Sequence, residues 1–382
     1  MDDEIGGEAL EFVAPQFRFG DSAVAALPGV LDRLGMERPL VVTDDGVAAA
    51  GVLDTALAAY DGPRETYRAA TEPSTDDFGD VPTGADGVVA VGGGSVLDTA
   101  KVAALRLAGG GPPADYLGVG KVSRDPVPLV AVPTTSGTGS QSTQTAVLAH
   151  EGVKRGISDE RLRPDRALVD PSLTYDLPRG VTARAGFDAF VHALESLTAR
   201  DYRRVPPRPI TYQGANPVSR PLSRRALGLV HGSLERATAD GTDRAARRAM
   251  SLGSHLAGLA FSNAGLGAVH ALASAVGGMV DRPHGDCLAA SIEPGLRYNL
   301  PVRRDAYADV ARDLGVGDTA AALVAECARL RDALDLPDSF AAVGLAAADR
   351  EELVGRTLVQ ERRLATNPRE VTDDLRDAIE SL

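Results

Sequence analysis

The sequence has only two cysteines, Cys287 and Cys327, and no tryptophan among its 382 residues. Two isolated cysteines exclude a disulfide framework and a CxxC metal site, so we expect two reduced thiols that are at least partly buried. Aromatic residues make up 4% of the chain, so the core must consist mainly of Val, Leu and Ala. No run of eighteen apolar residues occurs, and the acidic first residues lack the apolar segment of a secretory signal. We therefore expect a cytoplasmic protein with no membrane partner.

Lysine is also scarce, because only Lys101, Lys121 and Lys154 are found among the 40 basic residues. The formal net charge is -13, which would repel a phosphate backbone, so we expect no nucleic-acid partner. An acidic, lysine-poor surface suits a halophilic protein, since salt screens the repulsion between like charges. A GC-rich genome that favours arginine codons would give the same composition, and both explanations stay open.

The length and the hydrophobic pattern predict two domains. A chain of 382 residues is too long for one compact core. Three apolar runs, Arg38–Thr43, Gly87–Val91 and Pro126–Val132, alternate with helical stretches, which predicts a parallel sheet covered on both faces. From Val181 onward helical periodicity dominates. We therefore expect an α/β domain at residues 1–178 and an all-helical domain at residues 179–382.

A glycine-rich turn, Gly92-Gly93-Gly94-Ser95, follows the second apolar run. Without Cβ atoms the backbone can approach a pyrophosphate closely, and a helix N-terminus offers free N–H groups to it. Ser95 and Asp98 have the S-x-x-D spacing of a capping box, which predicts a helix that opens at Ser95. The turn lacks the G-x-G-x-x-G spacing, so an ordinary strand-to-helix turn is the alternative.

Two further segments follow predicted strands. Asp44 could accept hydrogen bonds from ribose hydroxyls and would repel a 2′-phosphate, which favours NAD over NADP. A turn-forming aspartate explains the same residue equally well. The segment from Thr134 to Ser140 carries hydroxyls and glycines that could bind phosphate, ribose or the nicotinamide amide, although an ordinary loop has the same composition.

Four residues of the second half have the chemistry of a metal site. Asp188 and His192 are spaced i, i+4 and so share one helix face, while His270 and His284 lie in a later stretch. Three imidazoles and one carboxylate suit Fe²⁺ or Zn²⁺. A lone histidine is more often structural, which is the interpretation we give to His150, His231 and His255, and an Asp–His pair also arises as a helix salt bridge.

The chain resembles the iron-dependent (group III) alcohol dehydrogenases almost end to end. The matching segments are, in chain order, Phe19-Gly20, Val42-Thr43-Asp44, Gly92 to Lys101, Pro133 to Ser140, Gly186 to Glu195, Ala215-Asn216-Pro217, Gly265 to His270, Pro283-His284-Gly285 and Asn367-Pro368-Arg369. The resemblance implies a Rossmann-like dinucleotide-binding domain followed by a helical domain, in a dehydroquinate synthase-like architecture with the active site in the cleft between them. It also implies hydride transfer between a small alcohol or carbonyl substrate and NAD(P), and at the family level a homodimer.

The resemblance assigns roles to individual residues. The implied metal ligands are Asp188, His192, His270 and His284, and His270 also belongs to the catalytic set. Gly93, Gly94 and Ser95 would meet the pyrophosphate, whereas Thr134, Thr135 and Thr138 would meet the central and nicotinamide parts. Asp98 and Thr143 complete the expected cofactor site, with Lys154 near the nicotinamide ribose.

The chain departs from the family at three places. Ser274 stands where members often carry a second histidine that is thought to pass protons or to contact the nicotinamide. We place Ser274 in the catalytic set and expect the proton to leave through water, the ribose hydroxyls or Ser274. Gln141 stands where Glu is common. The segment Arg203–Pro209, within residues 201–213, resembles an insertion; it could cap the cleft or serve assembly, but an inert exposed loop is the simpler interpretation.

Other functions on the same scaffold remain as alternatives. One is a dehydroquinate synthase-like lyase, although its phosphorylated acid needs a lysine- and arginine-rich pocket. Another is a metal-free reductase similar to maleylacetate reductase, against which the complete ligand set argues. A third is a cofactor-binding protein without activity.

Overall fold

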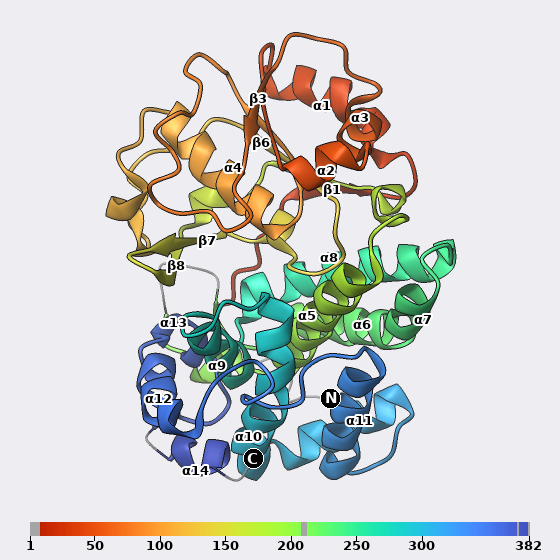
Figure 1. Ribbon diagram of the computed structural model, residues 1–382, viewed down its shortest axis with the longest axis vertical. Helices are drawn as coiled ribbons and strands as arrows, with labels where there is room; N and C mark the ends of the chain where they lie inside the picture. The colour runs from red at the N-terminus through yellow and green to blue at the C-terminus, as the bar shows by residue number, and fades with distance from the viewer. Residues whose placement is uncertain (1–7, 208–211, 373, 381–382) are drawn as a thin grey trace.

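The computed structural model describes residues 8–207, 212–372 and 374–380. Figure 1 shows the large sheet and the helices around it in one half of the molecule, and a helical assembly in the other half. Every named strand precedes helix α5 (Arg179–Thr198). The predicted fold class, a parallel α/β part followed by a helical part, is confirmed.

The large sheet has six parallel strands in the order β1-β9-β6-β4-β2-β3. Their bounds are Gln16–Phe19 (β1), Leu40–Thr43 (β2), Glu65–Arg68 (β3), Val88–Gly92 (β4), Leu129–Pro133 (β6) and Arg166–Val169 (β9). The three predicted apolar runs correspond to β2, β4 and β6, which are buried along their whole length. The prediction missed β1 and β3, whose mostly exposed edge positions carry polar residues, and the short β9.

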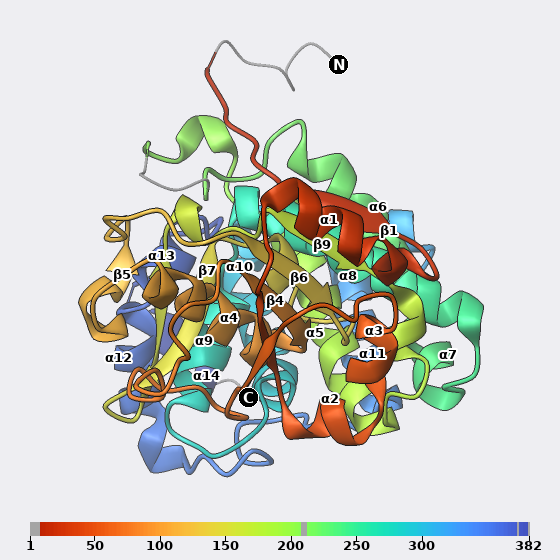
Figure 2. The same ribbon diagram turned by 90° about the horizontal axis from the view of Figure 1, so that it is seen from above.

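Alternate residues of the central strands pack into two separate hydrophobic cores, one on each face of the sheet. Val89 and Val91 of β4 pack with α1 (Leu27–Leu34) and α3 (Val52–Leu57) on one face. Val88 and Ala90 pack with α4 (Gly94–Leu107) on the other, and Figure 2 shows the strands between α1 and α4. Because both faces are covered, these strands are apolar throughout rather than alternating.

A smaller three-stranded sheet, which the sequence analysis did not predict, flanks α4. It consists of β5 (Gly118–Val119), β8 (Val153–Ser158) and β7 (Thr145–His150), and β7 and β8 form an antiparallel hairpin. Glu151 and Gly152 both have positive φ, as a two-residue hairpin turn requires. The hairpin brings Thr145 and Lys154 to the cleft described below.

In the part of the chain that the structure describes, the second half is built from α5 and nine further helices. Their bounds are Ser219–His231 (α6), Leu234–Ala239 (α7), Arg244–Ala264 (α8), Ala268–Gly277 (α9), His284–Leu314 (α10), Ala320–Ala333 (α11), Arg350–Leu358 (α12), Glu361–Leu364 (α13) and Leu375–Glu380 (α14). The remaining described helices are α2 (Asp45–Ala49) and the 3-10 turns Ala23–Ala26, Pro113–Tyr116, Ser140–Ser142, Glu160–Leu162, Pro171–Thr174, Tyr202–Arg204 and Ala347–Asp349.

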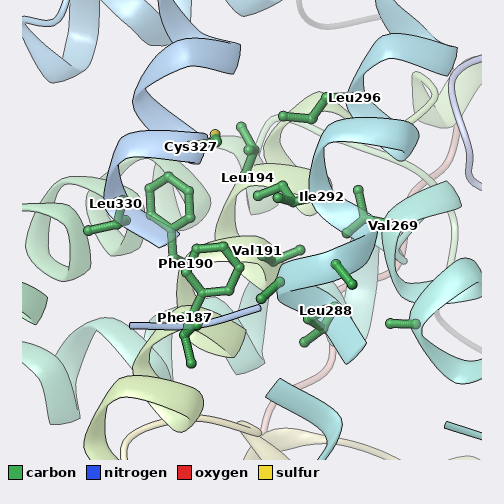
Figure 3. Close-up of a cluster of buried hydrophobic side chains, with 14 of the residues drawn as sticks. Phe187, Phe190, Val191, Leu194, Val269, Leu288, Ile292, Leu296, Cys327 and Leu330 are labelled. Carbon is green, nitrogen blue, oxygen red and sulfur yellow. The ribbon is translucent and has the colours of Figure 1, made fainter. Parts of the chain in front are cut away.

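The core of the helical half surrounds α5. Figure 3 shows Phe187 and Phe190 of α5 beside side chains of α9, α10 and α11. Both cysteines are buried and unpaired, as predicted. Among the described residues, no single helix is long and apolar enough to cross a membrane, and α8 and α9 pass that test only together, as a pair bent by 101°.

The segment at residues 201–213 is only partly an exposed loop. Four of its residues are exposed, as expected: Arg203, Arg204, Pro206 and Pro207. Tyr202 and Tyr212, on either side of them, are buried. The last two residues of the predicted insertion, Arg208 and Pro209, lie outside the described residues.

The loop that follows β6 packs directly on α8, backbone against backbone. A Cβ atom on Gly258 would lie 2.9 Å from the Cα atom and from the carbonyl oxygen of Gly139. Gly139 itself has φ +63, a conformation that favours glycine. Small residues at both positions therefore set the spacing between this loop and the helical half.

A buried ammonium group joins α4 to the same loop and to β7. Lys101 Nζ donates hydrogen bonds to Ser140 Oγ (2.7 Å), Thr143 Oγ1 (2.9 Å) and the carbonyl oxygen of Thr145 (2.6 Å). Burial lowers the pKa of Lys101 to about 8, and the nearby carboxylate of Asp98 opposes this shift.

We expect Gly258→Ala to lower the free energy of unfolding by about 1–3 kcal/mol, because the new methyl group overlaps backbone atoms that cannot rotate away. Gly228→Ala is the matched control: Gly228 is exposed on α6 with no atom within 4 Å of an added Cβ, so it should raise stability by up to about 1 kcal/mol. Urea unfolding of both variants measures the difference. Equal changes in the free energy of unfolding for Gly258→Ala and Gly228→Ala would contradict the close contact between Gly258 and Gly139.

We expect the pKa of Lys101 to appear in the pH dependence of stability. Between pH 8 and pH 10 the unfolded chain binds more protons at this residue than the folded chain does, so the folded state gains stability as the pH rises. Relative to Lys101→Met, the free energy of unfolding of the wild type should increase by about 2 kcal/mol over this range. Urea titrations at each pH measure it, with the exposed Lys121→Met as control. A flat difference would show that Lys101 keeps its ordinary pKa.

Candidate metal centre

Helix α5 carries two kinds of side chain on two sides. Asp188, His192 and Glu195 follow the i, i+4, i+7 spacing that places residues on one helix face. Phe187 and Phe190 lie off that face, in the core of Figure 3. All five residues are buried, which explains why this long helix has no solvent-facing stripe in its middle turns.

Asp188, His192 and His270 come together as a buried cluster. One ligand atom from each residue lies within 4.8 Å of the others. Asp188 Oδ1 is 3.3 Å from His192 Nδ1 and 3.3 Å from His270 Nε2. The imidazole rings of His192 and His270 stack at 4.4 Å, and the ring of Phe261 covers His192 at 4.1 Å.

The protonation of the cluster suits a divalent cation. Burial lowers the pKa of His192 to about 3, against the opposing effect of Asp188, so this imidazole is neutral and has a free lone pair. His192 Nδ1 is buried and has no hydrogen-bond partner among the described residues. Burial alone would raise the pKa of Asp188, but the surrounding imidazoles hold it below its usual range, so the carboxylate is ionised. The donor set therefore fits Fe²⁺ or Zn²⁺.

Glu195 fixes the orientation of His270. Its Oε2 accepts a hydrogen bond from His270 Nδ1 at 2.6 Å, and its Oε1 accepts one from the backbone N–H of Val269 at 2.8 Å. Burial lowers the pKa of His270, but the carboxylates of Asp188 and Glu195 outweigh it and raise the value. A carboxylate behind a histidine ligand is a recurrent arrangement in metal sites, because it sets the ring's tautomer and angle.

His284, the fourth predicted ligand, lies beside the cluster rather than in it. It is the first residue of α10, and its ring centre is 5.8 Å from that of His270. Burial lowers the pKa of His284 to about 4, so this imidazole is neutral as well.

A deep cleft contains the cluster and many of the predicted cofactor residues. It holds about 1280 Å³ of space, including its open mouth. The predicted residues that line it are Gly94, Ser95, Asp98, Thr138, Thr143, Lys154, Asp188, His192, His270, Ser274 and His284. The predicted residues that do not line it are Asp44, Gly93, Thr134 and Thr135.

The glycine-rich turn has the tight packing expected, but the predicted capping box is wrong. Helix α4 begins at Gly94, with Gly93 as its N-cap and no side-chain cap. Ser95 is therefore already inside the first turn, and its Oγ donates to the carbonyl oxygen of Thr71 at 2.7 Å. Asp98 instead accepts hydrogen bonds from Ser140 Oγ and from the backbone N–H of Val147. A Cβ on Gly94 would lie 2.7 Å from Thr138 Cγ2, so the turn needs glycine there.

Two other predicted cofactor residues have structural partners. Asp44 caps α2, since its Oδ1 accepts a hydrogen bond from the backbone N–H of Val47 at 2.7 Å. Lys154 forms an ion pair with Glu72, with Nζ 2.7 Å from Oε1. Ser274 lies one turn after His270 on α9, and it borders the cleft without being fully buried.

The remaining histidines have partners away from the cluster. His150 Nδ1 is 2.9 Å from Thr75 Oγ1, His231 Nε2 is 2.8 Å from Glu326 Oε1, and His255 Nδ1 is 3.0 Å from Ser142 Oγ. This agrees with the structural interpretation. Gln141 is buried near His255, with Nε2 3.4 Å from Nδ1.

The sequence analysis missed several residues of the site. Glu195 could have been found from its i+7 spacing to Asp188. The residues Tyr212, Phe261, Arg362 and Arg363 also line the cleft, but they come from distant segments, and no local pattern indicates that they meet.

Comparison with known proteins gives a consistent result along the whole chain. The family models "Iron-containing alcohol dehydrogenase" and "Fe-containing alcohol dehydrogenase family, C-terminal" match residues 14–171 and 182–381. The NAD-dependent methanol dehydrogenase of Bacillus methanolicus is 32% identical, and the alignment covers 94% of this chain and 96% of the relative. The sulfoacetaldehyde reductase of Bilophila wadsworthia is 33% identical, with 96% of each chain covered.

A solved structure of 1,3-propanediol oxidoreductase superposes with a TM-score of 0.89 at 29% identity, covering 98% of this chain and 100% of the other. The fold and the sequence therefore agree with the resemblance and with the predicted enzyme class, an oxidoreductase that acts on CH–OH groups. The chain belongs to the iron-containing alcohol dehydrogenase family.

Proposed function

We propose that this enzyme transfers a hydride between an alcohol and NAD at a divalent ion held by Asp188, His192 and His270. The observation that carries this proposal is the buried Asp–His–His cluster in the wall of a cleft that also contains the glycine-rich turn. His284, whose ring centre is 5.8 Å from that of His270, would be the fourth ligand. A divalent ion bound there supplies Lewis acidity to the oxygen of the substrate, and NAD accepts the hydride.

The chain's own residues would position the reactants. Glu195 holds His270, and the ring of Phe261 covers His192, so neither imidazole is free to turn. Ser274 borders the cleft one turn from His270, so its hydroxyl is our candidate for passing the alcohol proton toward solvent in place of the missing histidine.

The cofactor would lie along the N-terminus of α4. Gly93, Gly94 and Ser95 would meet the pyrophosphate, and Thr134, Thr135, Thr138 and Thr143 the central and nicotinamide parts. Asp98 would act by holding Ser140, and Lys154 would lie near the ribose of nicotinamide. Asp44 has one carboxylate oxygen engaged in capping α2, which leaves the other to favour NAD over NADP.

Several finer features remain predictions: a cytoplasmic location, a homodimer, a halophilic origin of the acidic surface and a domain division near residue 178. Either Fe²⁺ or Zn²⁺ suits the ligands, and availability would decide between them. The relatives described above are named for methanol and for sulfoacetaldehyde at nearly the same identity, so identity does not select a substrate.

We expect the enzyme to form NADH from NAD and a panel of primary and secondary alcohols. The formation of NADH should stop after chelation and resume when Fe²⁺ or Zn²⁺ is added. Absorbance of NADH measures it, with untreated enzyme as control. A turnover rate that the chelator does not change would indicate the metal-free reductase instead. Turnover of a phosphorylated acid without net NADH would indicate the lyase, and no turnover at all would indicate a non-catalytic protein.

We expect Glu195→Gln to weaken metal binding about 10- to 100-fold, because the amide is a poorer acceptor for the His270 ring than the carboxylate. Competition with a coloured chelator under anaerobic conditions measures the affinity. Glu352→Gln, which changes an exposed carboxylate on α12, is the control and should bind metal like the wild type. Unchanged affinity in Glu195→Gln would remove Glu195 from the metal site.

A further inference from the structure

Two adjacent arginines line the same cleft as the metal cluster. Arg362 and Arg363 belong to α13, and α13 packs against α9, the helix that carries His270 and Ser274. Both side chains are only partly covered by protein, so they face the space of the cleft.

Arg363 has little to neutralise its charge. Its one side-chain hydrogen bond within the described part of the chain runs from Nη1 to Gln360 Oε1 at 2.8 Å, and no described carboxylate forms an ion pair with it. Burial and then the neighbouring Arg362 lower its pKa to about 9, against the opposing effects of Tyr212 and the carboxylate of Glu195, so it stays protonated at neutral pH. Arg363 and His284 line the same cleft, together with the residues of the metal cluster.

Arg362 is a fixed second charge beside it. Its Nη1 donates to three hydroxyls, those of Thr145 (2.8 Å), Ser158 (2.9 Å) and Tyr212 (3.2 Å), and its Cζ lies 5.4 Å from the centre of the Tyr212 ring. All three acceptors are neutral. The contacts hold the guanidinium in place and leave its positive charge uncompensated.

The lack of a paired carboxylate matters because of where these two arginines lie. Some covered arginines are paired, as Arg331 is with Glu293 at 2.7 Å, and others donate only to neutral oxygens, as Arg247 and Arg303 do, but none of these three lines the cleft. The three described carboxylates that line the cleft are engaged elsewhere: Glu72 with Lys154, Asp98 with Ser140 and the backbone of Val147, and Asp188 with His192 and His270. Two neighbouring guanidiniums without a carboxylate cost free energy in a partly desolvated site, and an anionic ligand would relieve that cost.

We propose that Arg363, supported by Arg362, is an anion subsite for the substrate, so that the preferred substrates are short hydroxyalkyl carboxylates or sulfonates. The anionic group would bind the guanidinium while the carbinol carbon lies at the Asp188–His192–His270 cluster. The reaction is then hydroxyalkyl anion + NAD⁺ → oxoalkyl anion + NADH + H⁺. This inference rests on the proposed function, because it names the substrate class of the same site.

The test compares size-matched substrates in steady state: 4-hydroxybutyrate, 3-hydroxypropane-1-sulfonate and the neutral 1,4-butanediol. The wild type should show a higher kcat/KM for at least one of the anions than for the diol. In Arg363→Gln the ratio of anionic to neutral kcat/KM should fall about 10- to 100-fold, because a charge-assisted hydrogen bond is lost. The carboxylate and sulfonate arms show which anion the subsite takes.

Two further variants separate charge from folding. Arg363→Lys keeps the charge but not the planar pair of donors, so it should retain part of the ratio. Arg297→Gln removes the same charge from the exposed side of α10 and should leave the ratio at the wild-type value. Thermal melting of each variant checks that it is folded.

Calorimetry measures the affinity of the enzyme for 4-hydroxybutyrate and for 3-hydroxypropane-1-sulfonate, and so tests the subsite without turnover. Binding that is lost in Arg363→Gln, together with no turnover of any alcohol, would keep the subsite and overturn the proposed function. Turnover of 1,4-butanediol in preference to both anions would overturn the subsite and keep the function. An Arg363→Gln variant whose KM rises for NAD, with an unchanged ratio, would assign the arginine to a cofactor phosphate and overturn the subsite as well.

Discussion

The metal cluster depends on one helix that is buried on all sides. The middle turns of α5 place Phe187 and Phe190 in the helical core, turn Asp188 and His192 toward the cleft, and direct Glu195 at His270. A charged carboxylate is stable at such a depth only when other groups compensate it. Imidazoles surround Asp188, and the His270 ring and two backbone N–H groups bind Glu195. The core therefore fixes the geometry of the site. Glu195 and His270 satisfy each other, whereas His192 Nδ1 has no hydrogen-bond partner among the described residues.

The sequence predicted the parts whose signal is local. Continuous Val and Leu runs predicted β2, β4 and β6, because a strand covered on both faces has no polar alternation. The edge strands β1 and β3 were missed, since exposed positions there carry polar residues that resemble a loop. The capping box failed because three glycines let α4 begin one residue earlier, at Gly94, which moved Ser95 into the helix.

The candidate site was predictable where a motif gives the residue type and the spacing. Asp188, His192 and His270 could be named from the sequence, and the fold brings them together. Arg363 could not be named from the sequence, because it stands out only by having no carboxylate in an ion pair with it among the described residues. Such an absence is a property of tertiary packing, as are the stacking of Phe261 on His192 and the contact of Tyr212 with Thr145.

The contact of Gly139 with Gly258 has a consequence for the cleft. The loop after β6 and helix α8 touch through their backbones, and Lys101 ties the same loop to α4. Phe261, on the ring of His192, is three residues from Gly258 on that helix. The loop after β6 and helix α8 form two walls of the cleft beside the metal cluster. Their backbone contact holds them in a fixed relative position in the folded chain before a ligand binds.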